Sequence, residues 1–323
     1  RRVLFRSRYV TDIFTDWALE FLEAEKEEDR PFYLSLHYTA PHSPWYRSQH
    51  PPEFFDPYYN DCPFRSVPDE PRSPSANRTD FFDSPDKRRE KLSGYYGSIT
   101  AMDAQIRRVL DWLDDQGIRE NTIVFFTSDN GMNMGHHGLC GKGNGSTPVN
   151  FFETSVKVPA ILSRPGHIPS GRIAEGLYSH YDFMPTLLDT LGLPVPEASG
   201  YPGRSFAPLL NGEPDPGRDE VVVFEEYGPN RMVRDTRYKY IHRYPDGPNE
   251  CYDLERDPGE RTNRIDDADL ADVITSMRER LTSWFEQYVD PALDGAGNAV
   301  TGRGQLDRAD LPQQGDEIGR AHV

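Results

Sequence analysis

The feature that most constrains the fold is a helix, a short turn, a strand and a polar loop that follow one another directly. From Leu92 onward, apolar residues recur every three or four positions and stop at Gly117, which predicts a helix ending at a C-terminal glycine. After Asn121 and Thr122, residues 123–127 form a β-branched and aromatic run, followed at once by the loop 128–131 of Ser, Asp, Asn and Gly. This order is typical of an α/β domain, in which ligand sites lie at the carboxyl ends of strands.

Segments on either side of this unit add helices and strands of the same class. Residues 11–24 carry apolar side chains at helical spacing, and Phe32–Tyr38 is an aromatic and aliphatic run typical of a buried strand. Residues 46–90 are rich in Pro, Asp, Arg and Ser with little periodicity, so we expect a long irregular surface excursion there. Val158–Ser163 predicts a further strand, and residues 182–192 predict a helix capped by the first of them.

The pattern changes after the Gly- and Pro-rich segment 212–217. Short strand-forming runs alternate there with turn residues, which favours an antiparallel sheet. The predicted strands are Val221–Glu226, Arg231–Asp235, Tyr238–Arg243 and Glu250–Leu254. A helix over 270–288 can cover one face of that sheet. We therefore expect an α/β domain over 8–215 and an α+β domain over 216–293, with disordered or non-native sequence at both ends, including 294–323.

Composition excludes several classes of protein. The 323 residues hold 53 Asp and Glu against 36 Lys and Arg, a net charge of −17, so neither a nucleic acid nor an anionic lipid surface is expected as the main partner. No apolar run approaches the roughly 20 residues of a membrane span. Cys62, Cys140 and Cys251 lie far apart, so neither a disulfide framework nor a zinc spacing can be built from them.

Oxygen-bearing side chains stand at the end of the strand that precedes residue 128. Asp129 and Asn130 place a carboxylate and a carboxamide oxygen side by side, which suits a hard divalent cation. An ordinary Asx turn is the alternative for so short a motif. Lys142 follows in a glycine-rich loop, where its ammonium can neutralise an anionic oxygen beside the metal; a solvated loop lysine is the alternative.

Three histidines are further candidates. His42 lies just past the strand predicted to end at Tyr38 and can serve as an acid or base at neutral pH. His136 and His137 are expected to contact substrate or to be exposed, with metal ligation as the alternative. Two metal ligands, a lysine and a histidine at the same edge of the sheet make a site for a tetrahedral anion. No catalytic role is assigned to Glu153, Lys157, Asp182 or Arg204.

The order of these motifs resembles that of the formylglycine-dependent sulfatases, which are arylsulfatase-like members of the alkaline phosphatase-like superfamily. The resemblance is carried by Pro41-His42 after a strand, by 121–131, by Gly141-Lys142-Gly143 and by 156–159. Matches at 178–188 and 251–260 then extend it. It covers residues 10–290 in outline.

The resemblance implies a fold, a cofactor and roles for four residues. The fold is an alkaline phosphatase-like sandwich with a mixed central sheet, joined to a smaller α+β domain with an antiparallel sheet and a long helix. One calcium or magnesium ion is implied, with Asp129 and Asn130 as two of its ligands. Lys142 matches the lysine that contacts the sulfate and helps stabilise the leaving oxygen, and His42 matches the histidine near that leaving group.

The implied nucleophile is a formylglycine, made by a formylglycine-generating enzyme within a Cys/Ser-x-Pro-x-Arg motif. In the family this motif and a pair of aspartate ligands precede the strand that leads to His42, and residues 1–41 match neither. The sequence from Cys62 to Arg65 resembles the motif superficially, but its proline follows the cysteine directly. We therefore expect the central and C-terminal part of a sulfatase, with no nucleophile, an incomplete metal shell and no turnover alone.

The function implied by the resemblance is hydrolysis of a sulfate ester of a sugar or aryl compound by metal-assisted nucleophilic attack. A phosphomonoester, phosphonate or phosphodiester hydrolase of the same superfamily is the alternative. Such relatives tend to carry Asp-His at this point, and Asn130 instead favours one hard ion. A non-enzymatic binding protein or relic on the same fold is another alternative. The resemblance favours a periplasmic or extracellular location.

Overall fold

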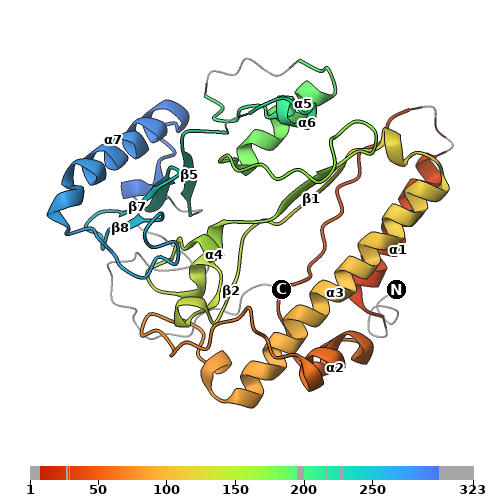
Figure 1. The fold of residues 1–323 in the computed structure, drawn as a ribbon, viewed down its shortest axis with the longest axis horizontal. Helices are drawn as coiled ribbons and strands as arrows, with labels where there is room; N and C mark the ends of the chain where they lie inside the picture. Colours follow the sequence, from red (N-terminus) through yellow and green to blue (C-terminus); the bar gives the residue numbers. More distant parts are fainter. Residues whose placement is uncertain are drawn as a thin grey trace.

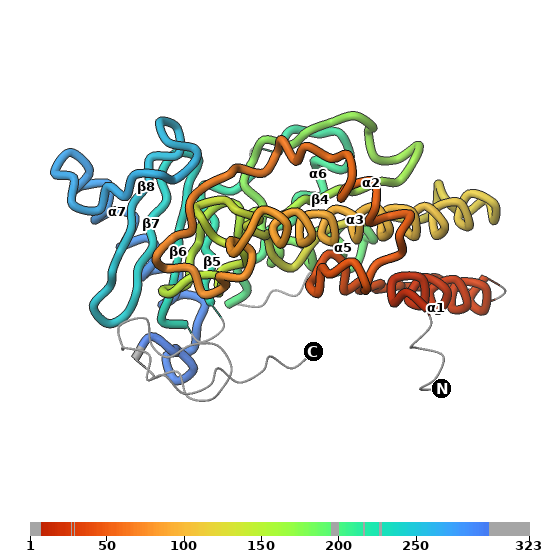
Figure 2. The backbone as a smooth tube through the Cα atoms, turned by 90° about the horizontal axis from the view of Figure 1, so that it is seen from below, coloured from red at the N-terminus to blue at the C-terminus, as the bar shows by residue number. Residues whose placement is uncertain are grey.

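The computed structural model describes residues 8–26, 28, 30–194, 200–215, 217–225 and 228–297. Two long helices lie at one end of the molecule and a four-stranded antiparallel sheet at the other, with two strand pairs between them (Figure 1, Figure 2). In the described ranges, no helix has the length and apolar character needed to cross a membrane. The expectations for residues 1–7 and 298–323 lie outside the described residues.

Helix α1 (Val10–Glu25) confirms the helix predicted over 11–24. It buries Ile13, Ala18 and Leu22 and packs beside the longer helix α3. The Thr15 hydroxyl oxygen lies 2.7 Å from the Tyr38 hydroxyl oxygen, which ties α1 to the segment that leads to residue 42.

Helix α3 (Pro85–Asp115) confirms the helix predicted from Leu92, and it starts earlier than its apolar pattern indicates. Ser84 caps the helix by accepting a hydrogen bond from the Lys87 backbone N–H, and proline follows at the first helical position. The chain leaves the helix through Gly117, whose φ is +69°. Polar capping residues therefore set the start of the helix, and the glycine sets its end.

The strand predicted over Phe32–Tyr38 is not a paired strand in the structure. Side chains alternate along it between exposed and half-buried, as in an extended backbone. A strand also needs a neighbour to pair its N–H and C=O groups, and within the described ranges no segment pairs with residues 32–38. The local sequence favours the extended conformation, but the pairing depends on a neighbour.

The excursion predicted as irregular over 46–90 contains more helix than expected. Helix α2 (Pro52–Asp61) packs against α3, and Phe55 at its centre is fully buried. Single turns η2 (Arg47–Gln49) and η3 (Asp80–Phe82) flank it. Pro57 inside α2 weakens the helical sequence signal, so packing against α3 is needed to stabilise this helix.

Strands β1 (Val124–Thr127) and β4 (Ala160–Ser163) confirm the strands predicted there, and they pair antiparallel with each other. The chain between them forms a second pair, β2 (Asn133–Met134) and β3 (Cys140–Gly141). It also forms the turns η5 (His136–Gly138) and η6 (Gly143–Gly145) and the short helix α4 (Glu153–Val156). The turn η4 (Arg119–Asn121) precedes β1.

The helix predicted over 182–192 is confirmed as α5 (Phe183–Thr190), preceded by the turn η7 (His180–Asp182). The predicted capping of this helix by Asp182 is wrong: the carboxylate makes no cap hydrogen bond to α5. It accepts from the Ser179 backbone N–H in a capping box of η7 and pairs with Arg218 at 2.6 Å. Phe183 stacks on Phe125 of β1 with ring centroids 4.9 Å apart, so α5 covers one face of that strand. Helix α6 (Ala207–Leu210) packs beside α5.

The C-terminal strands form the predicted antiparallel sheet, in the order β5 (Val221–Phe224), β6 (Asn230–Arg234), β7 (Tyr238–Arg243) and β8 (Glu250–Asp253). After the turn η8 (Ala268–Leu270), helix α7 (Ala271–Tyr288) covers one face, as predicted. Each large side chain buried there contributes about 1.5–3 kcal/mol. These residues are Val222, Val233, Tyr240, Met277, Leu281, Trp284 and Phe285.

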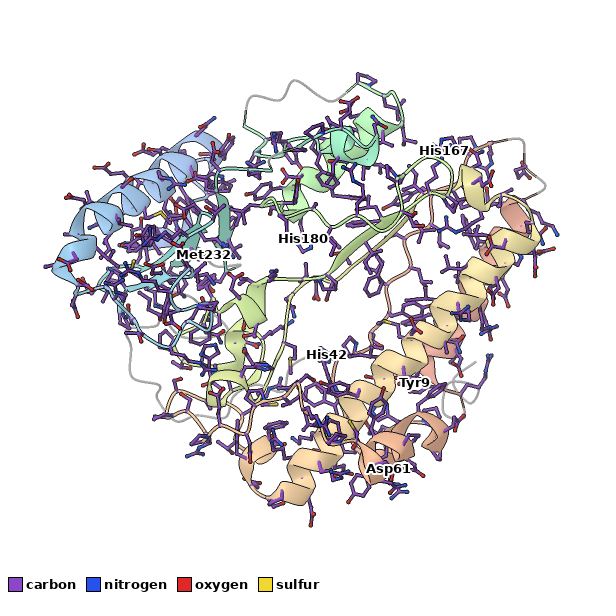
Figure 3. The ribbon with its side chains drawn as sticks, in the orientation of Figure 1. Tyr9, His42, Asp61, His167, His180 and Met232 are labelled. Atoms are coloured by element: carbon purple, nitrogen blue, oxygen red, sulfur yellow. The ribbon has the colours of Figure 1, made fainter. Side chains whose placement is uncertain are left out.

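The opposite face of the C-terminal sheet packs on residues 149–156, just before β4. Val149 and Phe151 meet Met232, Ile241 and Tyr252 in a buried apolar cluster. Met232 is labelled within this sheet in Figure 3. The mixed α/β class, the antiparallel C-terminal sheet and its long helix are as predicted, whereas the domain boundary at residue 215 stays a prediction.

Candidate active site

The polar loop at the end of β1 is turned by its own side chains. The backbone N–H of Asn130 donates to Asp129 Oδ1 at 2.8 Å, and Ser128 Oγ donates to the Asn130 carbonyl at 3.0 Å. Asp129 is exposed and Asn130 is half-buried. The loop is therefore turned by local hydrogen bonds, in keeping with the turn that the sequence offered as an alternative to a metal site. This turn holds both oxygen-bearing side chains at the carboxyl end of the strand.

The structure brings Lys142 to this loop, as predicted. Its Nζ donates to Asn130 Oδ1 at 3.0 Å, from the turn between β3 and η6. Lys142 as a whole is half-buried. A positive charge and two side chains with potential metal-ligand oxygens thus lie at the end of β1.

A buried asparagine that the sequence did not single out joins β3 to α4, and α4 in turn holds the β1 loop. Asn133 is fully buried and donates through Nδ2 to the Gly141 carbonyl at 3.0 Å and to Ser155 Oγ at 2.7 Å. The Gly131 N–H donates to the Ser155 carbonyl at 2.9 Å. A Cβ on Gly131 would lie 2.2 Å from the Thr154 carbonyl oxygen, so only glycine allows α4 to approach this closely.

A second buried asparagine holds the loop that carries Lys142. Asn150 Nδ2 lies within 3.2 Å of the Lys142 carbonyl, 3.0 Å of the Gly143 carbonyl and 2.9 Å of Ser146 Oγ. Its Oδ1 accepts a hydrogen bond from Ser155 at 2.6 Å. Ser155 therefore links both loops, and a buried Asn or Ser has no periodicity or motif by which the sequence could have marked it.

The two adjacent histidines lie in a different setting. The His137 ring stacks on Phe152 with centroids 3.6 Å apart, and burial, aided by Arg261, lowers its pKa to about 4. Burial also lowers the pKa of His136. Arg261 beside them pairs with Glu70 through two hydrogen bonds of 2.6 and 2.7 Å. Both rings are therefore neutral near pH 7, and no hydrogen bond among the described residues joins them to Lys142 or Asn130.

His42 is not in contact with the other predicted site residues. Its ring is exposed, and Nδ1 lies 2.9 Å from the Ser43 carbonyl oxygen. The loop is anchored by Trp45, which is 5% exposed and donates from Nε1 to the Pro41 carbonyl at 2.8 Å. Figure 3 shows His42 between α3 and the β2 region in that view, away from His180.

The donors at the end of β1 fit part of a metal site. Carboxylate and amide oxygens suit calcium or magnesium, which take about six to eight and six ligands respectively. In the described part of the chain, no group of three or more His, Cys, Asp or Glu is placed to hold a metal ion. Asp129 and Asn130 therefore form at most a partial ligand set.

Cys62 packs against an apolar cluster at the end of a helix. It lies at the end of α2, where its sulfur is 3.5 Å from the Phe64 backbone nitrogen and packs against a buried apolar cluster. No Cys/Ser-x-Pro-x-Arg sequence occurs in the 323 residues. The predicted absence of a nucleophile from this chain rests on that sequence, and Cys62 stays assigned to packing.

The arrangement of elements defines an alkaline phosphatase-like fold. A solved structure of a protein in complex with its substrate D-glucosamine-2-N,6-O-disulfate superimposes with a TM-score of 0.73 and 24% identity, covering 88% of this chain and 71% of that chain. At this identity the likeness concerns the fold.

The chain belongs to the sulfatase family. The family model Sulfatase matches residues 4–193, and the model for the N-sulphoglucosamine sulphohydrolase C-terminal region matches 149–287. A choline-sulfatase of Rhizobium meliloti is 28% identical over 84% of this chain and 54% of its own length. An arylsulfatase of Clostridium perfringens is 29% identical over 87% and 60%. The chain thus spans a little over half the length of these relatives.

Proposed function

We propose that the protein hydrolyses sulfate esters, with its site at the carboxyl end of β1. The observation that carries the proposal is the 3.0 Å contact between Lys142 Nζ and Asn130 Oδ1, which gathers a cation and oxygen donors at one strand end. Membership of the sulfatase family supports the same reaction class. A sulfated sugar is the proposed substrate, because a structural neighbour holds a disulfated glucosamine and aligned relatives include sugar sulfatases.

In this proposal the chain's own residues bind the sulfate and assist the leaving group. Lys142 neutralises charge on a sulfate oxygen and on the leaving oxygen, and His42 donates a proton to that oxygen. Asp129 and Asn130 are two ligands of one calcium or magnesium ion, which would supply further charge neutralisation. The nucleophile, a formylglycine, and the remaining ligands come from outside the described residues. His136 and His137 are proposed, at most, to contact substrate.

The test uses the protein expressed from its full reading frame together with a formylglycine-generating enzyme. Release of sulfate and of phosphate from aryl esters is measured with calcium and with a chelator. Sulfate release that depends on calcium supports the proposal, and phosphate release in its place supports the phosphoesterase alternative. The 323-residue chain expressed alone is expected to turn over neither ester.

Replacing Lys142 with Ala is expected to lower kcat by about 10²–10³, the usual effect of removing one charge-stabilising donor. Lys157→Ala is the matched control, because Lys157 is an exposed lysine close in sequence whose side chain no described hydrogen bond joins to the β1 loop. Equal kcat in wild type and Lys142→Ala would reject the assigned role.

A further inference from the structure

A fully buried lysine joins the C-terminal sheet to the short helix α4. Lys239 of β7 has no exposed side-chain surface. Its Nζ lies 2.8 Å from the Phe151 carbonyl oxygen, 2.6 Å from Glu260 Oε1 and 2.7 Å from Glu153 Oε1. Burying an ammonium is costly unless it is hydrogen-bonded and paired, so the hydrogen bonds to Phe151 and Glu260 and the ion pair with Glu153 fix where the lysine lies.

The two carboxylates bind the start of α4 to the sheet. Glu260 Oε2 accepts a hydrogen bond from the Glu153 backbone N–H at 2.6 Å. Glu153 Oε2 lies 2.5 Å from Arg234 Nη1, on the neighbouring strand β6. Burial alone would raise the pKa of Glu153, but Lys239 and Arg234 outweigh it and lower that pKa. Glu153 is therefore a carboxylate held between two cations of the sheet.

Helix α4, which these ion pairs hold to the sheet, also contacts both loops of the candidate site. Ser155 contacts the Gly131 N–H, Asn133 and Asn150, so it reaches both the β1 loop and the loop of Lys142. Residues 149–156 also pack on the sheet through the apolar cluster around Met232. Apolar contact is not directional, so it does not by itself fix the orientation of α4. Ion pairs and hydrogen bonds have fixed partners, and here they define one position of α4.

We propose that Lys239 and Arg234, through Glu153 and Glu260, form a positioning group for the candidate active site. It holds α4 in place, and α4 sets the separation of Asn130 and Lys142. Lys239 does not touch the reacting groups. The inference rests on the proposed function for its kinetic consequence, while its structural consequence can be measured without any turnover.

The experiment compares two pairs of variants in the full-length protein. Lys239→Met removes the central cation, and Arg234→Met removes the outer one while leaving Lys239 in place. Arg280→Met is the matched control, because Arg280 pairs with Glu220 at 2.5 Å and Asp235 at 3.0 Å on the same subdomain but has no described contact with α4. Arg234→Lys restores the charge and serves as the conservative variant.

The structural readout is hydrogen exchange of the Gly131 amide, which donates to Ser155. Lys239→Met and Arg234→Met are expected to speed this exchange at least about tenfold, because the acceptor is no longer held. Arg280→Met is expected to leave it unchanged. Exchange that stays at the wild-type rate in Arg234→Met, or that rises equally in Arg280→Met, would overturn the inference. Should Lys239→Met not fold, the comparison of Arg234→Met with Arg280→Met decides.

The kinetic readout uses whichever ester the wild type hydrolyses. Misplacing a charge-stabilising group lowers kcat by about 10–100-fold, and KM is expected to change by less than about threefold. Arg234→Lys should return kcat close to wild type. A KM effect alone would contradict positioning. If wild type turns over neither ester, the proposed function fails, and the exchange measurement still decides on the role of Lys239.

Discussion

Two buried asparagines make more of the hydrogen bonds that position the loops of the candidate site than its charged residues do. Asn133 and Asn150 are almost completely buried, and each joins Ser155 to a loop that carries a predicted site residue. An amide can donate and accept at once, so one side chain can bridge backbone groups from two loops. In the proposed function the charges of Asp129 and Lys142 supply the chemistry, and these amides hold the loops beside them.

Asn150→Ala is therefore expected to lower the free energy of unfolding by about 1–3 kcal/mol, because three acceptors lose a buried donor. Asn77→Ala is the matched control. Asn77 also contacts this loop, donating to the Asn144 carbonyl at 3.0 Å, but it is exposed and water can replace it. Its effect should stay within about 0.5 kcal/mol. Urea unfolding of both variants checks the difference, and equal losses would show that burial is not the cause.

At the scale of elements, a short turn beside the candidate site depends on a close backbone contact. The turn η5 carries the two histidines, and it closes against residues 71–73. Gly138 has φ +65°, and a Cβ there would lie 2.2 Å from the Pro71 carbonyl oxygen and 2.5 Å from the Ser73 nitrogen. Both the backbone conformation and the contact therefore require glycine.

Gly138→Ala is expected to destabilise the protein by well over the roughly 1–2 kcal/mol that a left-handed residue alone costs. Gly166→Ala separates the two causes, because Gly166 has φ +77° and a Cβ there would meet no atom within 4 Å. That variant should lose only the conformational part. Thermal unfolding of the two proteins gives the comparison, and similar losses would rule out the clash with Pro71.

The sequence predicts those elements whose signals are local. The helices α1, α3 and α7 and the four C-terminal strands follow from periodicity and capping residues, and the motif order places Asp129, Asn130 and Lys142 together. What it misses depends on distant contacts. Helix α2 is stabilised by packing on α3, and residues 32–38 have no paired neighbour in the described chain. The role of Asn150 depends on hydrogen bonds to a loop that folds back onto it.

At the scale of the whole molecule, the C-terminal sheet has a double role. One face buries the apolar side of α7, and the other carries the cations that hold α4. The site at the end of β1 is therefore supported from a sheet that contributes no predicted site residue. Stability of this sheet and order at the site are expected to change together.

Buried histidines make that stability depend on pH. His242 in β7 is 6% exposed, its Nδ1 lies 2.8 Å from the Tyr240 hydroxyl oxygen, and burial lowers its pKa to about 4. The unfolded chain takes up this proton near a pKa of about 6.5, so protonation favours unfolding. The contribution of neutral His242 is present above about pH 6.5 and is lost as the pH falls toward 4.

His242→Gln cannot be protonated in this range, so it is expected to lose less stability than wild type between about pH 7.5 and about pH 5. His136 and His137, whose pKa values are also lowered, keep part of the slope in the variant. His167→Gln is the control for the substitution itself, because His167 is exposed. Urea midpoints at the two pH values give the slopes. Parallel slopes for wild type and His242→Gln would mean that the ring is already protonated or accessible in the folded protein.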